Sequence, residues 1–189
     1  SNGTANWTTL GNGNTTNGEN WTCQITPYDG NSYGSAQNDS VVIDNCGMDL
    51  NQSLTLKADM DCGRTGITIK AEDIVLDCDW NEIKFGGTYH SYGITNTGGY
   101  DNVTIQNCDI VQKSSNWEAV GILLSDSKNG SIINNTIFMK SGGFRQSDAI
   151  KFMLSSNGNN VSNNTLTTIN RLFNDGIFLL QSKDNSIKY

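Results

Sequence analysis

Five charged residues form the strongest candidate for chemistry in this chain: Arg145, Asp148, Lys151, Arg171 and Asp175. Each aspartate directly precedes a small residue and an isoleucine, so the two occupy one position of a repeated pattern. On adjacent strands, about 4.8 Å apart, such carboxylates can acquire different pKa values and divide acid and base roles. Calcium binding and a surface ion-pair ladder of little energetic value are the alternatives.

A second acidic set flanks two of the cysteines and consists of Asp59, Asp61, Asp77 and Asp79. Oxygen ligands at alternate positions suit calcium, which is the one cofactor that the sequence leaves open. The competing interpretation is that these carboxylates belong to turns. His90 is the single histidine; it lies in a predicted loop, and we assign it no role.

The elements that carry these residues recur along the chain. Isoleucines that follow a glycine or alanine are spaced 27 or 28 residues apart, at Ile67, Ile94, Ile122, Ile150 and Ile177. A second apolar register contains Leu76, Ile105, Ile132, Val161 and Ile187, and a third contains Ile83, Ile110, Ile137 and Leu166. Three short alternating runs per repeat predict three strands per coil of a parallel solenoid, with these residues inside.

Asparagines at equivalent places, Asn107, Asn134 and Asn163, predict a coil corner. Asparagine tolerates left-handed backbone, and its amide can bond to the same amide in the next coil. On the alternate strand face, Leu123 and Phe178 are expected to form an outward apolar strip around Lys151, which offers a contact surface.

Two segments carry a family resemblance, the run from Gly121 to Ile137 and the run from Ile74 to Ile83. They resemble the repeats of right-handed parallel β-helix surface proteins of the pectate-lyase-like and NosD-like kind. The resemblance covers about residues 46–189 and implies about five coils. Enzymes on this fold usually act on acidic polysaccharides, but neither a Gly-His-Gly nor an Arg-x-Lys motif occurs in this chain.

Residues 1–45 lack the repeat. The run Trp21-Thr-Cys-Gln-Ile25 and the segment Ser40–Ile43 resemble the last strands of Ig-like modules in archaeal and bacterial surface proteins. We therefore expect an all-β chain with an Ig-like β fragment at 1–45 and the β-helix at 46–189. The C-terminal coil is expected to be truncated, because a solenoid needs a polar cap.

The compartment is indicated by cysteines and glycosylation motifs. A net charge of −7 disfavours nucleic acid as a partner, and no apolar run is long enough to span a bilayer. We predict a disulfide between Cys62 and Cys78, with Cys46 and Cys108 as a less certain second pair. Asn-X-Ser/Thr acceptor motifs for N-linked glycans occur at Asn2, Asn6, Asn14, Asn20, Asn38, Asn51, Asn102, Asn129, Asn134, Asn160 and Asn163. Those at 102, 129 and 160 are expected at equivalent corners.

Two functions follow from these features. The favoured one is a structural or adhesive extracellular glycoprotein, a subunit of a cell-surface layer, stalk or filament whose partners are copies of itself assembled head to tail. The other is a polysaccharide lyase or glycoside hydrolase that acts on acidic polysaccharide. Fold alone does not decide between them.

Overall fold

The computed structural model describes residues 19–42, 46–87, 89–114, 118–140, 146–169 and 175–188. The chain divides into two compact units, residues 1–44 and residues 45–189. All regular secondary structure in the described ranges is β-strand. None of these ranges contains a helix that is long and apolar enough to cross a membrane.

The described part of the first unit is an antiparallel pair, β1 (Asn20–Ile25) and β2 (Gln37–Val42). Because side chains alternate along a strand, Trp21, Cys23 and Ile25 share one face. Cys23 pairs in register with Asp39 and is an exposed free thiol. Strands thus cover the predicted run Trp21–Ile25 and residues 40–42 of the second predicted segment, whose Ile43 lies outside the described residues. The Ig-like character of this unit stays a prediction.

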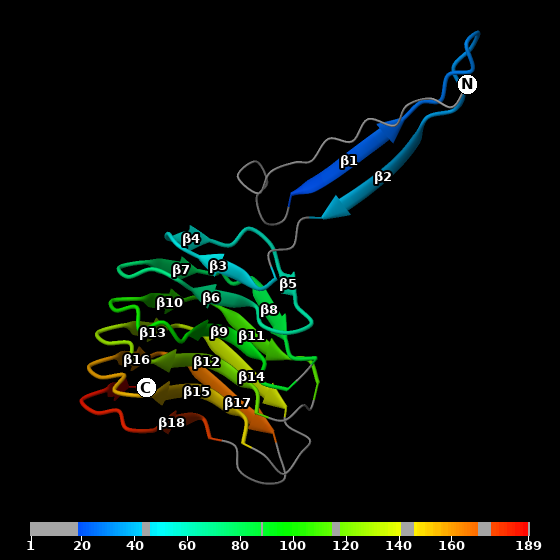
Figure 1. Cartoon of the computed structure of the whole chain (residues 1–189). Coiled ribbons are helices and arrows are strands. Elements are labelled where there is room, and N and C mark those ends of the chain that lie inside the picture. The colour runs from blue at the N-terminus through cyan, green and yellow to red at the C-terminus, as the bar shows by residue number, and fades with distance from the viewer. Residues whose placement is uncertain are drawn as a thin grey trace. The chain divides into compact units, whose positions relative to one another are not determined.

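The second unit is a solenoid of three parallel sheets, whose coils stack in chain order (Figure 1). The first sheet contains β3 (Met48–Leu50), β6 (Ile67–Ile69), β9 (Tyr92–Asn96), β12 (Val120–Ser125), β15 (Asp148–Met153) and β18 (Ile177–Leu179). The second contains β4 (Leu54–Thr55), β7 (Val75–Asp77), β10 (Thr104–Gln106), β13 (Ser131–Ile133), β16 (Asn160–Ser162) and β19 (Ser186–Lys188). The third contains β5 (Met60–Asp61), β8 (Glu82–Phe85), β11 (Asp109–Gln112), β14 (Thr136–Lys140) and β17 (Thr165–Ile169).

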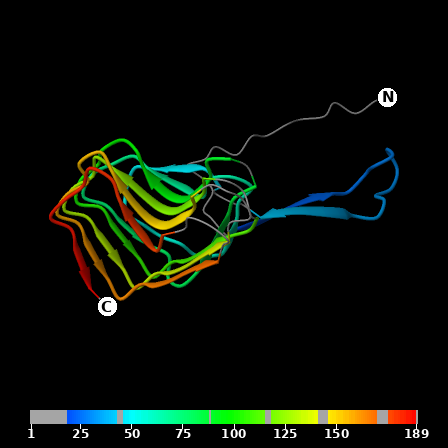
Figure 2. The ribbon, with the colours of Figure 1, turned by 90° about the horizontal axis from the view of Figure 1, so that it is seen from below.

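The apolar registers predicted from the sequence are the registers of the sheets. Ile67, Ile94, Ile122, Ile150 and Ile177 pair in succession, as do the residues of the other two registers. Successive coils overlie one another around a common interior (Figure 2), and most of these side chains are fully buried there. Ile187, on β19, is 40% exposed, because no further described strand pairs with β19 beyond β16.

The predicted corner of asparagines is present, but the amide ladder lies one residue later. Asn107, Asn134 and Asn163 all have positive φ, between 53° and 56°. The side-chain amide bonds between coils are made by the following residues: Asn135 Nδ2 donates to Asn164 Oδ1 at 2.9 Å. In the left-handed column itself, Asn107 Nδ2 donates to a carboxylate, Asp77 Oδ1 of the preceding coil, at 3.0 Å.

The disulfides differ from the predicted pairing. Cys46 is bonded to Cys62, and Cys78 is bonded to Cys108. Met48 pairs with Ile67, so the first coil is short, and the chain almost completes a turn between the first two cysteines. Cys62 and Cys78 follow strands of different sheets and therefore lie at different corners. Two disulfides indicate folding in an oxidising compartment.

We expect Ile122→Asp to unfold the coils around β12. Ile122 is fully buried, and an unpaired carboxylate in this interior, together with the lost apolar contact, is expected to cost more than about 4 kcal/mol. The matched control is Val75→Asp on β7, where the side chain is 39% exposed and a change within about 0.5 kcal/mol is expected. Denaturant unfolding followed by circular dichroism measures both; equal losses contradict the assigned interior.

The longer disulfide loop should contribute more stability. Replacing Cys78 and Cys108 together by serine opens a loop with a sequence separation of 30, against 16 for Cys46 and Cys62. Chain entropy gives losses of about 3.6 and about 3 kcal/mol respectively. Unfolding free energies of the two double variants test this order. Peptide mapping without reduction tests the pairing itself, and a Cys62–Cys78 peptide would contradict the structure.

Candidate functional site

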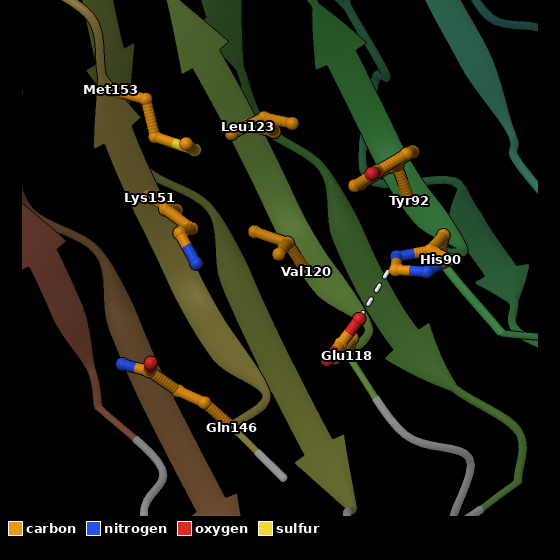
Figure 3. A pocket seen from close by; sticks show the side chains of 8 residues that line it. All are labelled: His90, Tyr92, Glu118, Val120, Leu123, Gln146, Lys151 and Met153. Atoms are coloured by element: carbon orange, nitrogen blue, oxygen red, sulfur yellow. Dashed lines mark ion pairs between the residues drawn. The ribbon is translucent and has the colours of Figure 1, made fainter. Parts of the chain in front are cut away.

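A cavity of about 350 Å³ opens on the outer face of the first sheet, over β9, β12 and β15 (Figure 3). Its lining consists of His90, Tyr92, Glu118, Val120, Leu123, Gln146, Lys151 and Met153. Side chains from three successive coils thus meet in one place. The cavity is the candidate site of this protein.

Strand register explains how residues so distant in sequence come together. Val120 pairs with Tyr92 on one side and with Asp148 on the other, while Leu123 pairs with Lys151. Because residues that pair in register lie on the same side of the sheet, positions that match in the repeat form columns across the coils. Close stacking also demands a small residue at Gly121, where an added Cβ would lie 2.5 Å from the carbonyl oxygen of Ala149.

A buried carboxylate lies beside the cavity. Asp148 is fully buried, and its Oδ2 lies 3.5 Å from Lys151 Nζ without a hydrogen-bond donor among the described residues. Burial raises the pKa of the Asp148 carboxyl and outweighs the opposing effect of the Lys151 ammonium. The lysine also lies over the Phe178 ring, 4.9 Å from its centroid. Its ammonium is therefore held in place at the cavity wall.

The opposite wall carries an ion pair. His90 Nδ1 lies 3.1 Å from Glu118 Oε2, and the dashed line in Figure 3 marks this contact. Tyr92 lies beside them, and its hydroxyl pKa is raised by partial burial and by the negative charge of Glu118. The phenol consequently stays protonated at neutral pH and can donate a hydrogen bond into the cavity.

The structure brings together three of the five charged residues named from the sequence. The backbone N–H of Asp175 donates to Asp148 Oδ1 at 3.3 Å, so the two aspartates are neighbours as predicted, with Lys151 beside them. Gln146 Nε2 donates to Asp175 Oδ2 at 2.9 Å. Arg145 and Arg171 lie outside the described residues.

Sequence reasoning missed the column formed by His90, Glu118 and Gln146. Each of the three precedes the small residue of its repeat by three positions, at Gly93, Gly121 and Ala149. This shared repeat position can be read from the sequence and would have identified the column, although the three residues differ in type. His90, to which the sequence analysis assigned no role, lines the cavity and lies 3.1 Å from Glu118.

The apolar strip expected around Lys151 has the predicted strand register, but Leu123 is less exposed to solvent than expected. Leu123, Lys151 and Phe178 pair in succession on the outer face. Leu123, however, is only 5% exposed, because the side chains around the cavity cover it. It is the apolar floor of a recess and does not form a flat contact surface.

The second acidic set is engaged elsewhere. Asp59 Oδ1 accepts the backbone N–H of Glu82, and Asp61 pairs with Lys113. Partial burial opposes ionisation of Asp77, but hydrogen bonds from the Asp79 N–H and from two side-chain amides, those of Asn107 and Gln106, leave its pKa below the usual value. In the described ranges, no three acidic, histidine or cysteine side chains are arranged to hold a metal ion.

Five of the glycosylation motifs place an exposed asparagine on the surface, at Asn38, Asn51, Asn102, Asn129 and Asn163. Asn102 and Asn129 occupy one left-handed corner column, as expected. Asn160 does not: it pairs with Ser131 as the first residue of β16, and Gly158 takes the corner position. Asn134 and Asn160 are half-buried, and Asn2, Asn6 and Asn14 lie outside the described residues.

Comparison with known proteins adds no relative: no protein-family model, curated protein or solved structure matches this chain.

Asp148 and Asp77 should give opposite pH dependences of stability. A raised folded-state pKa contributes stability that is present below the unfolded pKa of about 3.9 and is lost as the pH rises through the folded pKa, which is the case of Asp148. A lowered pKa contributes stability above about 3.9 that is lost as the pH falls, which is the case of Asp77.

Denaturant unfolding of the wild type, Asp148→Asn and Asp77→Asn between about pH 3 and about pH 7 measures both effects. The unfolding free energy of the wild type minus that of Asp148→Asn should fall as the pH rises. The unfolding free energy of the wild type minus that of Asp77→Asn should increase as the pH rises. Slopes of the same sign would contradict the assigned environments.

Proposed function

We propose that this protein is a structural or adhesive glycoprotein of a cell surface, a right-handed β-helix that forms part of a layer, stalk or filament outside the cell. The observation that carries the proposal is the stacked corner that holds Asn102 and Asn129. Both asparagines are exposed acceptor positions on adjacent coils, so glycans attached there would follow the solenoid axis.

The two disulfides support the same role. Cys78 and Cys108 join coils that are neighbours in the stack, and the fold is built from coil-to-coil backbone pairing. Such a scaffold suits mechanical and protective work outside the cell, where disulfides persist. Copies of this chain are the proposed assembly partners.

A second candidate, a lyase or hydrolase acting on polysaccharide, is favoured by one observation. The Asp148 carboxyl has a raised pKa and lies next to Asp175 and Lys151 at the edge of a cavity. A carboxyl whose pKa is raised by burial holds its proton more tightly than an ordinary aspartate, which is what a general acid requires. Release of reducing or unsaturated ends from a polysaccharide panel, abolished by Asp148→Asn, would establish this candidate in place of the first.

Location is the direct test of the favoured function. Antibodies against the purified chain should label the outside of unpermeabilised native cells in electron micrographs, with gold particles in a regular arrangement. Sedimentation of the native protein should show assemblies larger than one chain. Labelling confined to the cell interior would reject the proposal.

Glycan attachment is testable on the isolated chain. After secretion from a cell that performs N-glycosylation, the intact mass should exceed the bare 20.6 kDa, with glycopeptides at Asn102 and Asn129. Thr104→Ala and Ser131→Ala each remove one motif without changing the asparagine, and each should lower the mass by one glycan. A mass equal to the bare chain contradicts the prediction.

A further inference from the structure

The cavity over β9, β12 and β15 combines an apolar floor with a polar rim. Val120, Leu123 and Met153 supply the floor. Donors and acceptors stand around it: the Lys151 ammonium, the Gln146 carboxamide, the Tyr92 hydroxyl and the His90–Glu118 pair. Ligand sites of proteins have this composition, an apolar lining with a few placed polar groups, and about 350 Å³ lies at the lower end of their usual size.

One ammonium, that of Lys151, and two acidic side chains, Asp148 and Glu118, lie at the cavity. The Lys151 ammonium is balanced by the Asp148 carboxylate at 3.5 Å, and Glu118 faces His90 at 3.1 Å. An anionic ligand would meet two carboxylates in addition to the lysine, and the chain as a whole carries a net charge of −7. A cationic ligand would meet the lysine. The site therefore favours an uncharged ligand that both donates and accepts hydrogen bonds.

Two further features narrow the ligand chemistry. Lys151 is fixed between the Phe178 ring and Asp148, so it can donate to a ligand with little loss of conformational entropy. The buried Asp148 Oδ2, which has no hydrogen-bond donor among the described residues, keeps that ammonium oriented at the wall. Tyr92 offers an aromatic face together with a protonated hydroxyl. Rings that carry several hydroxyls and an apolar face match such a surface.

We propose that this cavity binds one neutral pyranose unit, with the apolar face of the sugar on Val120, Leu123 and Met153 and its hydroxyls on Lys151, Gln146 and Glu118. This inference rests on the adhesive role proposed above, for which it supplies the ligand class. Because the lining comes from three coils in register, an intact stack is needed for binding.

The test uses methyl glycosides of neutral hexoses, of the corresponding uronic acids and of hexosamines as probes. Saturation-transfer NMR and titration calorimetry with the folded chain should show binding of at least one neutral hexoside at millimolar concentration, with weaker binding of its uronic acid and its hexosamine. Lys151→Met should weaken that binding about tenfold, since it removes a charge-assisted hydrogen bond.

Matched variants separate the site from general effects. Lys128→Met removes another partly exposed, ion-paired lysine, at a corner away from the cavity, and should leave binding unchanged. Glu118→Gln should narrow the preference for the neutral sugar over its uronic acid, because it removes one of the two repelling carboxylates. Circular dichroism spectra that match the wild type confirm that each variant is folded.

Three results would overturn the inference: binding of none of the probes, tighter binding of the uronic acid than of the neutral hexoside by the wild type, or equal losses in Lys151→Met and Lys128→Met. These outcomes are independent of the location test. Surface labelling without sugar binding would leave a structural role and remove this ligand. Sugar binding by a protein found only inside cells would remove the surface role and keep the site.

Discussion

The pairing of each coil with the next is the interaction on which the rest of this structure depends. Backbone donors reach carbonyls about one repeat further along the chain, as from Asn129 to Asn157 and from Ile150 to Gly176. A shift of one residue would turn every interior side chain outward, because side chains alternate along a strand. The register therefore fixes which residues share a column, and the positions of the buried isoleucines, the corners and the cavity all follow from it.

That constraint explains why the strands were predictable and the corners less so. The interior columns are marked by apolar residues with a period near 27, and all three registers were aligned correctly, down to Ile187. Corners lack an apolar marker, so the amide ladder was predicted one residue early. The short first coil departs from the period, and the spacing of Cys62 and Cys78 alone could not reveal that Cys46 lies closer to Cys62.

The candidate site, too, was predictable from the sequence only in part. Asp148 and Lys151 were found because their residue types suggest chemistry, and the register then made Asp175 a neighbour. His90 and Gln146 share with Glu118 a repeat position but no chemical character, so a search by residue type passes over them. In a solenoid a site is a patch of adjacent columns, and its members are recognised by position before chemistry.

At Cys108, one corner column is held by a disulfide where the other coils use asparagine hydrogen bonds. The residues that precede Glu82, Asp109, Thr136 and Thr165 are Asn81, Cys108, Asn135 and Asn164. Asn164 Oδ1 accepts the N–H of Asn135, and Asn135 Oδ1 accepts the N–H of Cys108, each at 2.9 Å. Cys108 has no side-chain amide to continue the ladder, and its sulfur is instead bonded to Cys78. A covalent bond thus takes over where the hydrogen-bonded ladder stops, so the stack is held across this corner by two different means.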